Sequence, residues 1–347
     1  MKKYVVAVVG ATGAVGEELF NVIKEYDIPV EKMVPLASAK STGKMVAFNG
    51  EEVEVKELTC DVFAEENVEI AFFSAGGSIS AKFAECAVKA GAVVIDNTSH
   101  FRMVDDVPLV VPEINPEDIA LWEKTGIIAN PNCSTIQMVL ALKPLHDTFG
   151  IKRVDVSTYQ ATSGAGKVGM EELMEQLRAV FNFRLEDEVA KKEAFTHQIA
   201  LNVIPHIDKF MENGYTKEEM KMVNETNKIM HSNIAVSATC VRVPVLRSHS
   251  EAVTIHCEKP VDVAKAKEVL AAFENVEVQD DVENNIYPMP IIATDTDITF
   301  VGRIRKDNFD ENILHFWVVA DQVRVGAATN AVRIAKKWIA MQEKKDG

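Results

Sequence analysis

After an apolar run at residues 4–9, the chain reads Gly10-Ala11-Thr12-Gly13-Ala14-Val15-Gly16, and apolar side chains then recur at helical spacing over residues 15–26. This order predicts a strand, a tight turn and a helix. In such a turn, glycines let backbone N–H groups approach a pyrophosphate at the N-terminus of the helix. The spacing is GxxGxxG and not GxGxxG, and a tight turn alone can require glycine. The flanking strand and helix are therefore what favour a nucleotide site.

Strands and helices continue to alternate through the first part of the chain. Apolar runs predict strands at residues 33–36, 69–74, 92–96, 109–111 and 127–129, and helical spacing predicts a helix at 80–90. Strands separated by helices form a mostly parallel sheet. We therefore expect an α/β fold that begins with a Rossmann-like dinucleotide-binding domain.

From about residue 152 the pattern changes to longer alternating strands. These are predicted at residues 154–160, 234–245, 251–257, 298–305 and 313–319, with helices near 169–181, 217–231 and 263–273. Such a mixture predicts a second, α+β domain on a mixed or antiparallel sheet. The last helix, 326–341, is expected to return to the first domain. The predicted division is 1–132 plus 327–347 for the nucleotide-binding domain and 133–326 for the second.

Composition narrows the class of protein. The chain has 347 residues, 47% of them hydrophobic, which is enough for two domains with their own cores. Its longest apolar runs have the length of strands, and the N-terminus enters a strand instead of a signal-peptide core, so we expect a soluble, cytoplasmic protein. The net charge is 37 minus 52, or −15, which argues against nucleic acid or an anionic membrane as partner. An anionic ligand would need a local basic pocket.

The cysteines predict neither a disulfide framework nor a metal site. Their number is odd, they are widely spaced, and the chain has neither a CxxC motif nor a His/Cys cluster. We therefore expect reduced thiols. The five are Cys60, Cys86, Cys133, Cys240 and Cys257.

Cys133 stands apart from the others by its position. It follows the predicted strand 127–129 and precedes apolar residues at helical spacing over 134–149. A thiol at a helix N-terminus is exposed to unpaired backbone N–H groups, which favour the thiolate. The alternative is that Cys133, like most lone cysteines, is a small buried hydrophobe.

A nicotinamide domain followed by such a cysteine suggests aldehyde oxidation through a thioester. This chemistry needs a base, and His249 lies just before a predicted strand among polar neighbours, unlike a core histidine. Arg242 lies inside an otherwise apolar strand, where it must be paired, and a substrate carboxylate is a suitable partner. A buried ion pair of Arg242 with Glu251 or Asp155 is the structural alternative.

The residues after the second strand bear on the choice of cofactor. An NAD site usually has Asp or Glu there to bind the ribose 2′-OH. This chain instead reads Leu36-Ala37-Ser38-Ala39-Lys40-Ser41-Thr42. A cation and hydroxyls suit a 2′-phosphate, so NADP is predicted over NAD, unless Lys40 is merely a solvated loop lysine.

Eight blocks together carry a resemblance to a known family. They are GATGAVG at 10–16, HFRM at 100–103, NPNCSTIQ at 130–137, YQATSGAG at 159–166, EEMK at 218–221, ETNKI at 225–229, CVRVPVLRSHSE at 240–251 and DQVRVGAATN at 321–330. In this order they resemble aspartate-semialdehyde dehydrogenases, specifically the bacterial form. The resemblance implies NADPH-dependent reductive dephosphorylation of L-aspartyl-4-phosphate to L-aspartate 4-semialdehyde, a step toward lysine, methionine and threonine. It also implies a homodimer formed through the second, catalytic domain.

The resemblance also assigns roles to residues. It makes Cys133 the nucleophile and His249 its acid/base, with Gln160 orienting the acyl group. Arg242 would bind the substrate α-carboxylate and Glu218 its α-ammonium. The implied phosphate ligands are Arg102, Asn132 and Lys221. The implied cofactor contacts are Gly10, Thr12, Gly13, Ala14 and Val15 at the pyrophosphate, Ser38, Lys40 and Ser41 at the adenine end, and Ser163, Gly164 and Gln322 toward the nicotinamide.

Each role has a plainer alternative. Glu218 and Lys221 are spaced i, i+3 on a helix and could form a surface salt bridge. Arg102 could be a loop arginine and Gln160 a polar residue at a strand end. Two rival functions also remain. One is an N-acetyl-glutamyl-phosphate reductase, whose substrate offers no ammonium for Glu218. The other is a catalytically silent nucleotide-binding or redox-sensing protein with a reactive Cys133.

Overall fold

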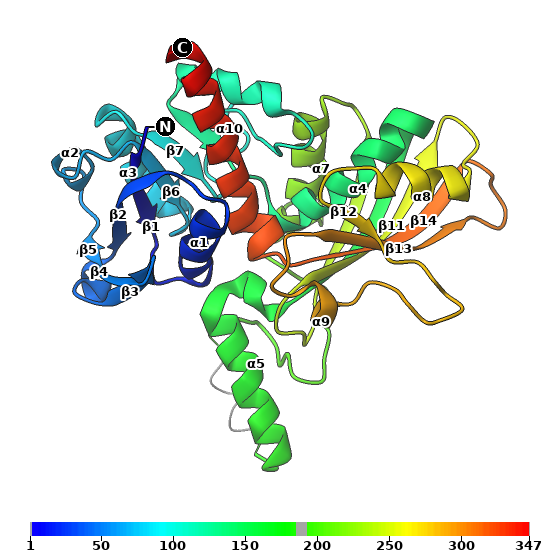
Figure 1. The fold of residues 1–347 in the computed structure, drawn as a ribbon. Coiled ribbons are helices and arrows are strands. Elements are labelled where there is room, and N and C mark those ends of the chain that lie inside the picture. The colour runs from blue at the N-terminus through cyan, green and yellow to red at the C-terminus, as the bar shows by residue number, and fades with distance from the viewer. Residues whose placement is uncertain (1, 185–192, 347) are drawn as a thin grey trace. The chain divides into compact units, whose positions relative to one another are not determined.

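The computed structural model describes residues 2–184 and 193–346. The chain divides into two compact units, Met1–Asn132 with Ala327–Gly347, and Cys133–Gly326 (Figure 1). Among the described residues, none of the helices combines the length and the apolar character that crossing a bilayer requires. Each unit has its own sheet.

The first unit contains a six-stranded parallel sheet in the order β5-β2-β1-β6-β7-β8. Its strands are β1 (Tyr4–Val9), β2 (Val30–Ala37), β5 (Lys56–Glu57), β6 (Ile70–Phe73), β7 (Val93–Asp96) and β8 (Ile127–Ala129). Helix α1 (Ala14–Glu25) connects β1 to β2, and α3 (Gly77–Lys89) connects β6 to β7. The strand order reverses at β1, which therefore marks the crevice where doubly wound sheets bind ligands.

Both faces of this sheet are covered, which explains why its strands read as continuous apolar runs. On one face Tyr4, Val6 and Val8 pack with α1 and α10 (Thr329–Asp346), and the ring of Trp338 lies edge-on to Tyr4 at 6.0 Å. On the other face Phe63 of α2 (Val62–Glu65) stacks on Phe73 of β6 at 6.0 Å. The C-terminal helix thus belongs to the core of the first unit.

The structure of this unit differs from the sequence pattern in several places, and neither β5 nor α2 was predicted. The expected strand 109–111 forms only an isolated bridge, Leu109 to Ala129. A hairpin of β3 (Met45–Phe48) and β4 (Glu51–Glu54) had not been expected. Its turn has positive φ at Asn49 and Gly50, the requirement of a tight two-residue hairpin. The short strands are mostly exposed, so they lack the apolar alternation that identifies a strand.

The second unit has a mixed six-stranded sheet in the order β10-β9-β11-β14-β13-β12. Its strands are β9 (Ile151–Gln160), β10 (Ala235–Arg242), β11 (His249–Cys257), β12 (Val276–Val278), β13 (Thr299–Lys306) and β14 (Ile313–Ala320). The centre is antiparallel, while β9 with β10 and β12 with β13 are parallel. The α/β fold with a second, mixed-sheet domain is therefore confirmed.

Helix α4 (Cys133–Phe149) contacts β9, β11, β13 and β14 and lies between α7 (Lys217–Met230) and α8 (Val263–Ala271) (Figure 1). Twelve of its 17 residues are buried, as expected for a helix with apolar residues on most of its surface. Helices α5 (Gly166–Phe181) and α9 (Pro290–Ala293) complete the unit. The start of α7 is fixed by a capping box, in which Glu219 N–H donates to Thr216 Oγ1 and Thr216 N–H donates to Glu219 Oε2.

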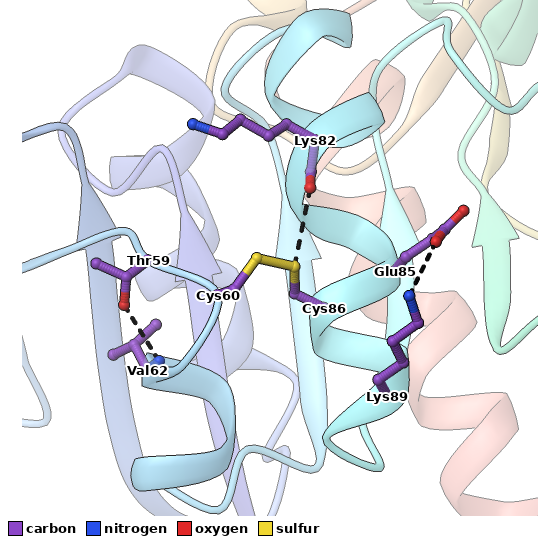
Figure 2. The surroundings of a disulfide bond; sticks show 7 residues. All are labelled: Thr59, Cys60, Val62, Lys82, Glu85, Cys86 and Lys89. Carbon is purple, nitrogen blue, oxygen red and sulfur yellow. Dashed lines mark hydrogen bonds and ion pairs between the residues drawn. A yellow bond between two sulfur atoms is a disulfide. The ribbon is translucent and has the colours of Figure 1, made fainter.

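One disulfide contradicts the expectation of reduced thiols. Cys60 and Cys86 are bonded to each other (Figure 2). Their Cα atoms are 5.2 Å apart, and Cys133, Cys240 and Cys257 are not disulfide-bonded. Cys60 follows β5 and Cys86 lies on α3, 26 residues later. Spacing could not reveal this pair, because it is the packing of the loop after β5 beside α3 that brings the two sulfurs together.

We expect Cys60→Ser to lower the free energy of unfolding of the first unit by about 3 kcal/mol, the loop-closure contribution for residues this far apart. Denaturant unfolding without and with a dithiol reductant measures it. The reductant should lower the free energy of unfolding of the wild type to that of the variant, and it should not change the value for the variant. Alkylation of the unfolded, unreduced wild type should modify three sulfurs, and modification of all five would contradict the disulfide.

Candidate active site and nucleotide pocket

A pocket of about 570 Å³ lies at the carboxyl ends of β1, β2 and β6, where the strand order reverses. Its walls come from the glycine turn, the end of β2, the chain after β5, and α3. They are formed by Gly10, Thr12, Gly13, Ala37, Ser38, Ala39, Glu57, Leu58, Ser74, Ala75, Ile79 and Phe83. The position and size of this pocket suit part of a dinucleotide.

The glycine turn has the shape that a pyrophosphate site needs. Gly10 has φ +92°, and a Cβ there would lie 2.8 Å from the carbonyl oxygen of Ser74. A Cβ on Gly16 would lie 2.1 Å from the carbonyl oxygen of Gly10. Only glycine fits either position, so the turn closes tightly and α1 begins at Ala14. The first N–H groups of a helix have no intrahelical partner and can bind an anion.

The adenine end of the pocket matches the sequence prediction only partly. Ser38 and Ala39 line it, whereas Lys40 is exposed in the short 3₁₀ helix η1 (Ala39–Ser41) and does not. Ser41 accepts a long hydrogen bond, 3.5 Å, from the Thr12 hydroxyl. Glu57, which sequence reasoning missed, contributes a carboxylate to the wall. No local pattern could have identified Glu57, because β5 pairs with β2 only in the folded sheet.

The loop that leads to Cys133 is held rigidly within the first unit. The Asn130 amide donates to Asn97 Oδ1 at 2.7 Å and accepts from Asn330 Nδ2 at 2.6 Å. Arg102 donates from Nε to the Asn130 carbonyl at 2.9 Å and from Nη2 to the Asn97 carbonyl at 2.8 Å. Arg102 and Asn132 are both buried. Arg102 is therefore a fixed part of this loop and not a solvated arginine.

Cys133 is the first residue of α4 and is half-buried. The other two thiols outside the disulfide are buried. Burial raises the pKa of both, strongly for Cys240 and to about 11 for Cys257. Of the thiols in the described residues, Cys133 is thus the one that is both accessible and placed at a helix N-terminus.

His249 is the first residue of β11 and is completely buried, which the polar residues around it in sequence did not suggest. Its Nδ1 accepts the backbone N–H of Ala161 at 3.1 Å. Since an acceptor nitrogen carries no proton, the neutral ring bears its hydrogen on Nε2. Burial, aided by the charge of Arg242, lowers the pKa of His249 to about 3. At neutral pH this imidazole is an uncharged hydrogen-bond donor.

Arg242 ends β10 and is also buried. Its Nη1 donates to the Ala161 carbonyl at 2.6 Å, and its guanidinium lies 5.8 Å from the ring centre of Phe195. Burial lowers the pKa of Arg242, while the charges of Glu218 and Cys133 raise it. The Cys133 thiol, the Arg242 guanidinium and the Glu218 carboxylate therefore interact in one site.

The ion pairs proposed as structural alternatives for Arg242 are not formed. Within the described ranges, Arg242 pairs with neither Glu251 nor Asp155. Asp155 instead binds Arg153, at 2.6 Å between Oδ1 and Nη2. Burial raises the pKa of Glu251 well above its ordinary value, and no nearby cation in the described part of the chain lowers it. The guanidinium of Arg242 thus retains the capacity to bind an anion.

A chain of hydrogen bonds joins four further polar side chains. Gln160 Nε2 donates to Glu218 Oε1 at 3.2 Å, and Lys221 Nζ lies 3.0 Å from Glu218 Oε2. Lys221 also binds Asp208 Oδ2 at 2.9 Å. The pair Glu218 and Lys221 is therefore mostly buried instead of lying on the surface. Sequence reasoning missed Asp208 and Phe195, which lie on an irregular segment that gives no pattern to interpret.

The second unit also contains the three residues predicted to lie toward the nicotinamide, which are Ser163, Gly164 and Gln322. Gln322 donates to the Ser163 hydroxyl and accepts the Ser248 N–H at 2.8 Å. Gly164 faces Arg242 and His249. The second unit therefore brings together a thiol, an imidazole donor, a guanidinium and a buried carboxylate, as acyl transfer to an amino-acid-like substrate requires.

Comparisons with known proteins agree with this geometry. Two family models match the chain: the NAD binding domain of semialdehyde dehydrogenase at residues 5–122, and the dimerisation domain of semialdehyde dehydrogenase at residues 142–325. The two matches correspond to the two sheets described above, and the second covers more than half of the chain.

Relatives of high identity extend over the full length. The aspartate-semialdehyde dehydrogenase of Campylobacter jejuni is 65% identical over 343 residues, covering 99% of both chains. The crystal structure of aspartate semialdehyde dehydrogenase II from Vibrio cholerae, complexed with ASA, has a TM-score of 0.94 at 48% identity, covering 98% of this chain and 99% of that one. The aspartate semialdehyde dehydrogenase of Candida albicans with NADP has a TM-score of 0.72 at 26% identity, covering 97% and 98%. On the strength of the two family matches and these full-length relatives, the chain belongs to the aspartate-semialdehyde dehydrogenase family.

Proposed function

We propose that this chain catalyses the reversible, NADPH-dependent reductive dephosphorylation of L-aspartyl-4-phosphate to L-aspartate 4-semialdehyde, which supplies lysine, methionine and threonine synthesis. The observation that carries the proposal is Cys133 at the start of α4, in a site with the buried Arg242 and His249. A thiol, an oxyanion donor and a carboxylate clamp are the parts that this reaction needs.

The first step is acyl transfer to Cys133. Its thiolate attacks the acyl carbon, a C–S bond forms, and the C–O bond to phosphate breaks with the electron pair leaving on phosphate. The N-terminal position of Cys133 on α4 favours the thiolate, because unpaired N–H groups stabilise its charge. After reduction, the C–S bond breaks as the carbonyl re-forms, which releases the aldehyde and regenerates the thiolate.

We propose that His249 stabilises the oxyanion by hydrogen bonding. The Nε2–H faces the site while Nδ1 is occupied by Ala161 N–H. Collapse of a hemithioacetal oxyanion to aldehyde and thiolate requires no net proton transfer, so a neutral donor is sufficient in this direction. The acid/base role expected from the sequence stays a prediction for the same ring, which would act in its neutral form because burial lowers its pKa to about 3.

Substrate recognition is assigned to the second unit. Arg242 would bind the α-carboxylate through its planar fork, and Glu218 would bind the α-ammonium. Gln160, hydrogen-bonded to Glu218, would orient the acyl group. Lys221 forms ion pairs with Asp208 and Glu218. We propose that it binds phosphate once Glu218 has turned to the substrate ammonium. Arg102 and Asn132 are the further proposed phosphate ligands.

The nicotinamide cofactor is proposed to bind the first unit, where the absence of Cβ atoms at Gly10 and Gly16 lets the turn close tightly beside the pocket. When bound, reduced nicotinamide supplies hydride to the acyl carbon. Thr12, Gly13, Ala14 and Val15 would hold the pyrophosphate, with Gly10 shaping the turn. Ser38, Lys40 and Ser41 are the proposed contacts of the adenosine 2′-phosphate, and Ser163, Gly164 and Gln322 those nearest the nicotinamide.

We also propose that the chain forms a homodimer through the second unit. Its proposed location is the cytoplasm. The matching family model is named a dimerisation domain, and Phe181, Leu201 and Phe210 of this unit are exposed apolar side chains. Light scattering after gel filtration should give twice the mass of 38.3 kDa, and a monomer would contradict the assembly.

The reaction is tested by phosphate-dependent reduction of NADP, followed by absorbance, with aspartate semialdehyde beside N-acetylglutamate semialdehyde. We expect turnover of the first only, because Glu218 has an ammonium to bind in that substrate alone. A preference for the acetylated aldehyde would favour the rival reductase, which the named relatives do not support. Turnover of neither would favour a silent nucleotide-binding protein.

Lys40→Glu should lower the preference for NADP over NAD, measured as the ratio of kcat/KM values, by roughly tenfold or more, on the scale of one charge-assisted contact. The change removes a cation from the 2′-phosphate and adds an acceptor for a 2′-OH. Lys337→Glu, an exposed lysine on α10 in the same unit, is the control for net charge. An unchanged ratio in Lys40→Glu would make Lys40 a solvated loop residue.

A further inference from the structure

We propose that Gly164 and Gly326 are positioning residues: their missing side chains leave the space in which Arg242, His249 and Cys133 take their reactive places. The inference rests on the proposed function for the roles of these three residues. It adds a reason for glycine at two positions of this site that lie outside the nucleotide turn.

The backbone does not demand glycine at either position. Gly10, in the nucleotide turn, has a positive φ that other residues rarely adopt. Gly164 and Gly326 have no such φ, so any L-residue could adopt their conformation. What excludes a side chain at these two positions is therefore the set of atoms that surrounds them.

Gly326 lies against the nucleophile. A Cβ on Gly326 would be 2.6 Å from the Cβ and 2.9 Å from the Cα of Cys133. These atoms belong to the start of α4, a helix packed against four strands, and cannot swing aside as the end of a long side chain can. A methyl group at this position must therefore displace Cys133 or the segment that carries Gly326.

That segment is itself held firmly. Gly326 lies in the short π-helical turn η4 (Arg324–Ala328), and its N–H donates to the Asp321 carbonyl at 3.3 Å. The buried Asp321 carboxylate accepts the Val323 N–H at 3.0 Å and pairs with Arg247 Nε at 2.8 Å. With both sides fixed, the added volume of a methyl group would change the position of the Cys133 sulfur.

Gly164 lies against the two groups that meet the substrate. A Cβ there would be 2.6 Å from Arg242 Nη1, and 3.2 Å from both Cε1 and Nε2 of His249. The guanidinium is the end of a flexible side chain, so it would yield first and lose its bond to the Ala161 carbonyl. The two glycines therefore predict different defects: Gly164→Ala should act through Arg242, and Gly326→Ala through Cys133.

Gly326→Ala tests the second defect. We expect kcat to fall roughly 100-fold, the scale for displacing a catalytic group by about 1 Å, with little change in KM. The alkylation rate of Cys133 with iodoacetamide, followed against pH, should fall or shift its midpoint. This readout needs no substrate, so it remains informative even if the proposed reaction is wrong. An unchanged kcat and alkylation profile, or failure to fold, would overturn the positioning role of Gly326.

Gly164→Ala tests the first defect in a double-mutant cycle with Arg242→Lys. We expect Gly164→Ala alone to raise KM for aspartate semialdehyde at least tenfold, and to have less than a threefold effect in the Arg242→Lys background, because the displaced guanidinium is then already lost. The alkylation profile of Cys133 should not change. Equal effects in both backgrounds would overturn the assignment to Arg242.

Gly77→Ala is the matched control. Gly77 begins α3, has no positive φ, and a Cβ there would meet nothing closer than His100 Cβ at 3.8 Å. A Gly-to-Ala change with room for the methyl group is usually neutral or stabilising. We expect unchanged kcat, KM and alkylation in this variant, whereas a loss like that of Gly326→Ala would show that the assay reports any added methyl group.

Discussion

Cys133→Ala should abolish turnover, with a loss of roughly 10⁴-fold or more, the scale seen when a covalent nucleophile is removed. No other thiol can replace it. Cys60 and Cys86 are bonded to each other, and Cys240 and Cys257 are buried, with their pKa values raised. Initial rates with aspartate semialdehyde, phosphate and NADP measure the loss.

Cys133→Ser should keep at most a trace of activity, because an alkoxide is far harder to generate than a thiolate and is a poorer leaving group. The matched controls are Cys240→Ala and Cys257→Ala, which should retain the wild-type kcat per folded molecule. Stoichiometric alkylation of the native protein should inactivate it, with peptide mapping placing the label on Cys133. Wild-type-like turnover by either Cys133 variant would exclude the covalent mechanism.

Arg242→Lys should fold normally and lose about 2–4 kcal/mol of transition-state stabilisation, the scale of losing one partner of a desolvated charge pair. Lysine keeps the charge but lacks the planar fork. Its single ammonium cannot both bond the Ala161 carbonyl, as Nη1 does, and clamp a carboxylate in two places. Values of kcat/KM for aspartate semialdehyde measure the effect.

A second substrate distinguishes binding of the α-carboxylate by Arg242 from a structural role of this residue. With an aldehyde that lacks the α-carboxylate, the loss in Arg242→Lys should shrink, since that substrate does not use the guanidinium. Arg153→Lys is the control, because Arg153 is an exposed strand arginine bonded to Asp155. Equal losses on both substrates, or a large fall in Tm with unchanged activity per folded molecule, would assign Arg242 to the fold.

Much of the fold followed from local patterns. The apolar run at residues 4–9 and the turn that begins at Gly10 specify a strand and a helix by period and turn chemistry alone, and both were predicted within a residue of their bounds. The spacing of apolar residues did not predict elements that lack a regular alternation, nor which strands pair. The exposed β3–β4 hairpin lacks alternation, and the parallel pairing of β9 with β10 depends on which strands meet in space.

The disulfide and the burial of the candidate site could not be predicted from the sequence, because both depend on contacts between residues far apart in the chain. Cys60 and Cys86 have no motif, and only the packing of α3 brings them together. His249 was expected among polar neighbours but is completely buried, with its tautomer set by Ala161, 88 residues away along the chain.

The sequence by itself determined the longer strands and helices of both units, the glycine turn, and the position of Cys133 at the start of a helix. Each of these depends on residues close together in the chain, whose spacing fixes their geometry. Only the tertiary structure decided that Arg242 pairs with neither Glu251 nor Asp155, that Glu218 and Lys221 are mostly buried, and that Gly326 must be glycine. These depend on desolvation and on contacts between distant residues, which exist only when the whole chain has packed.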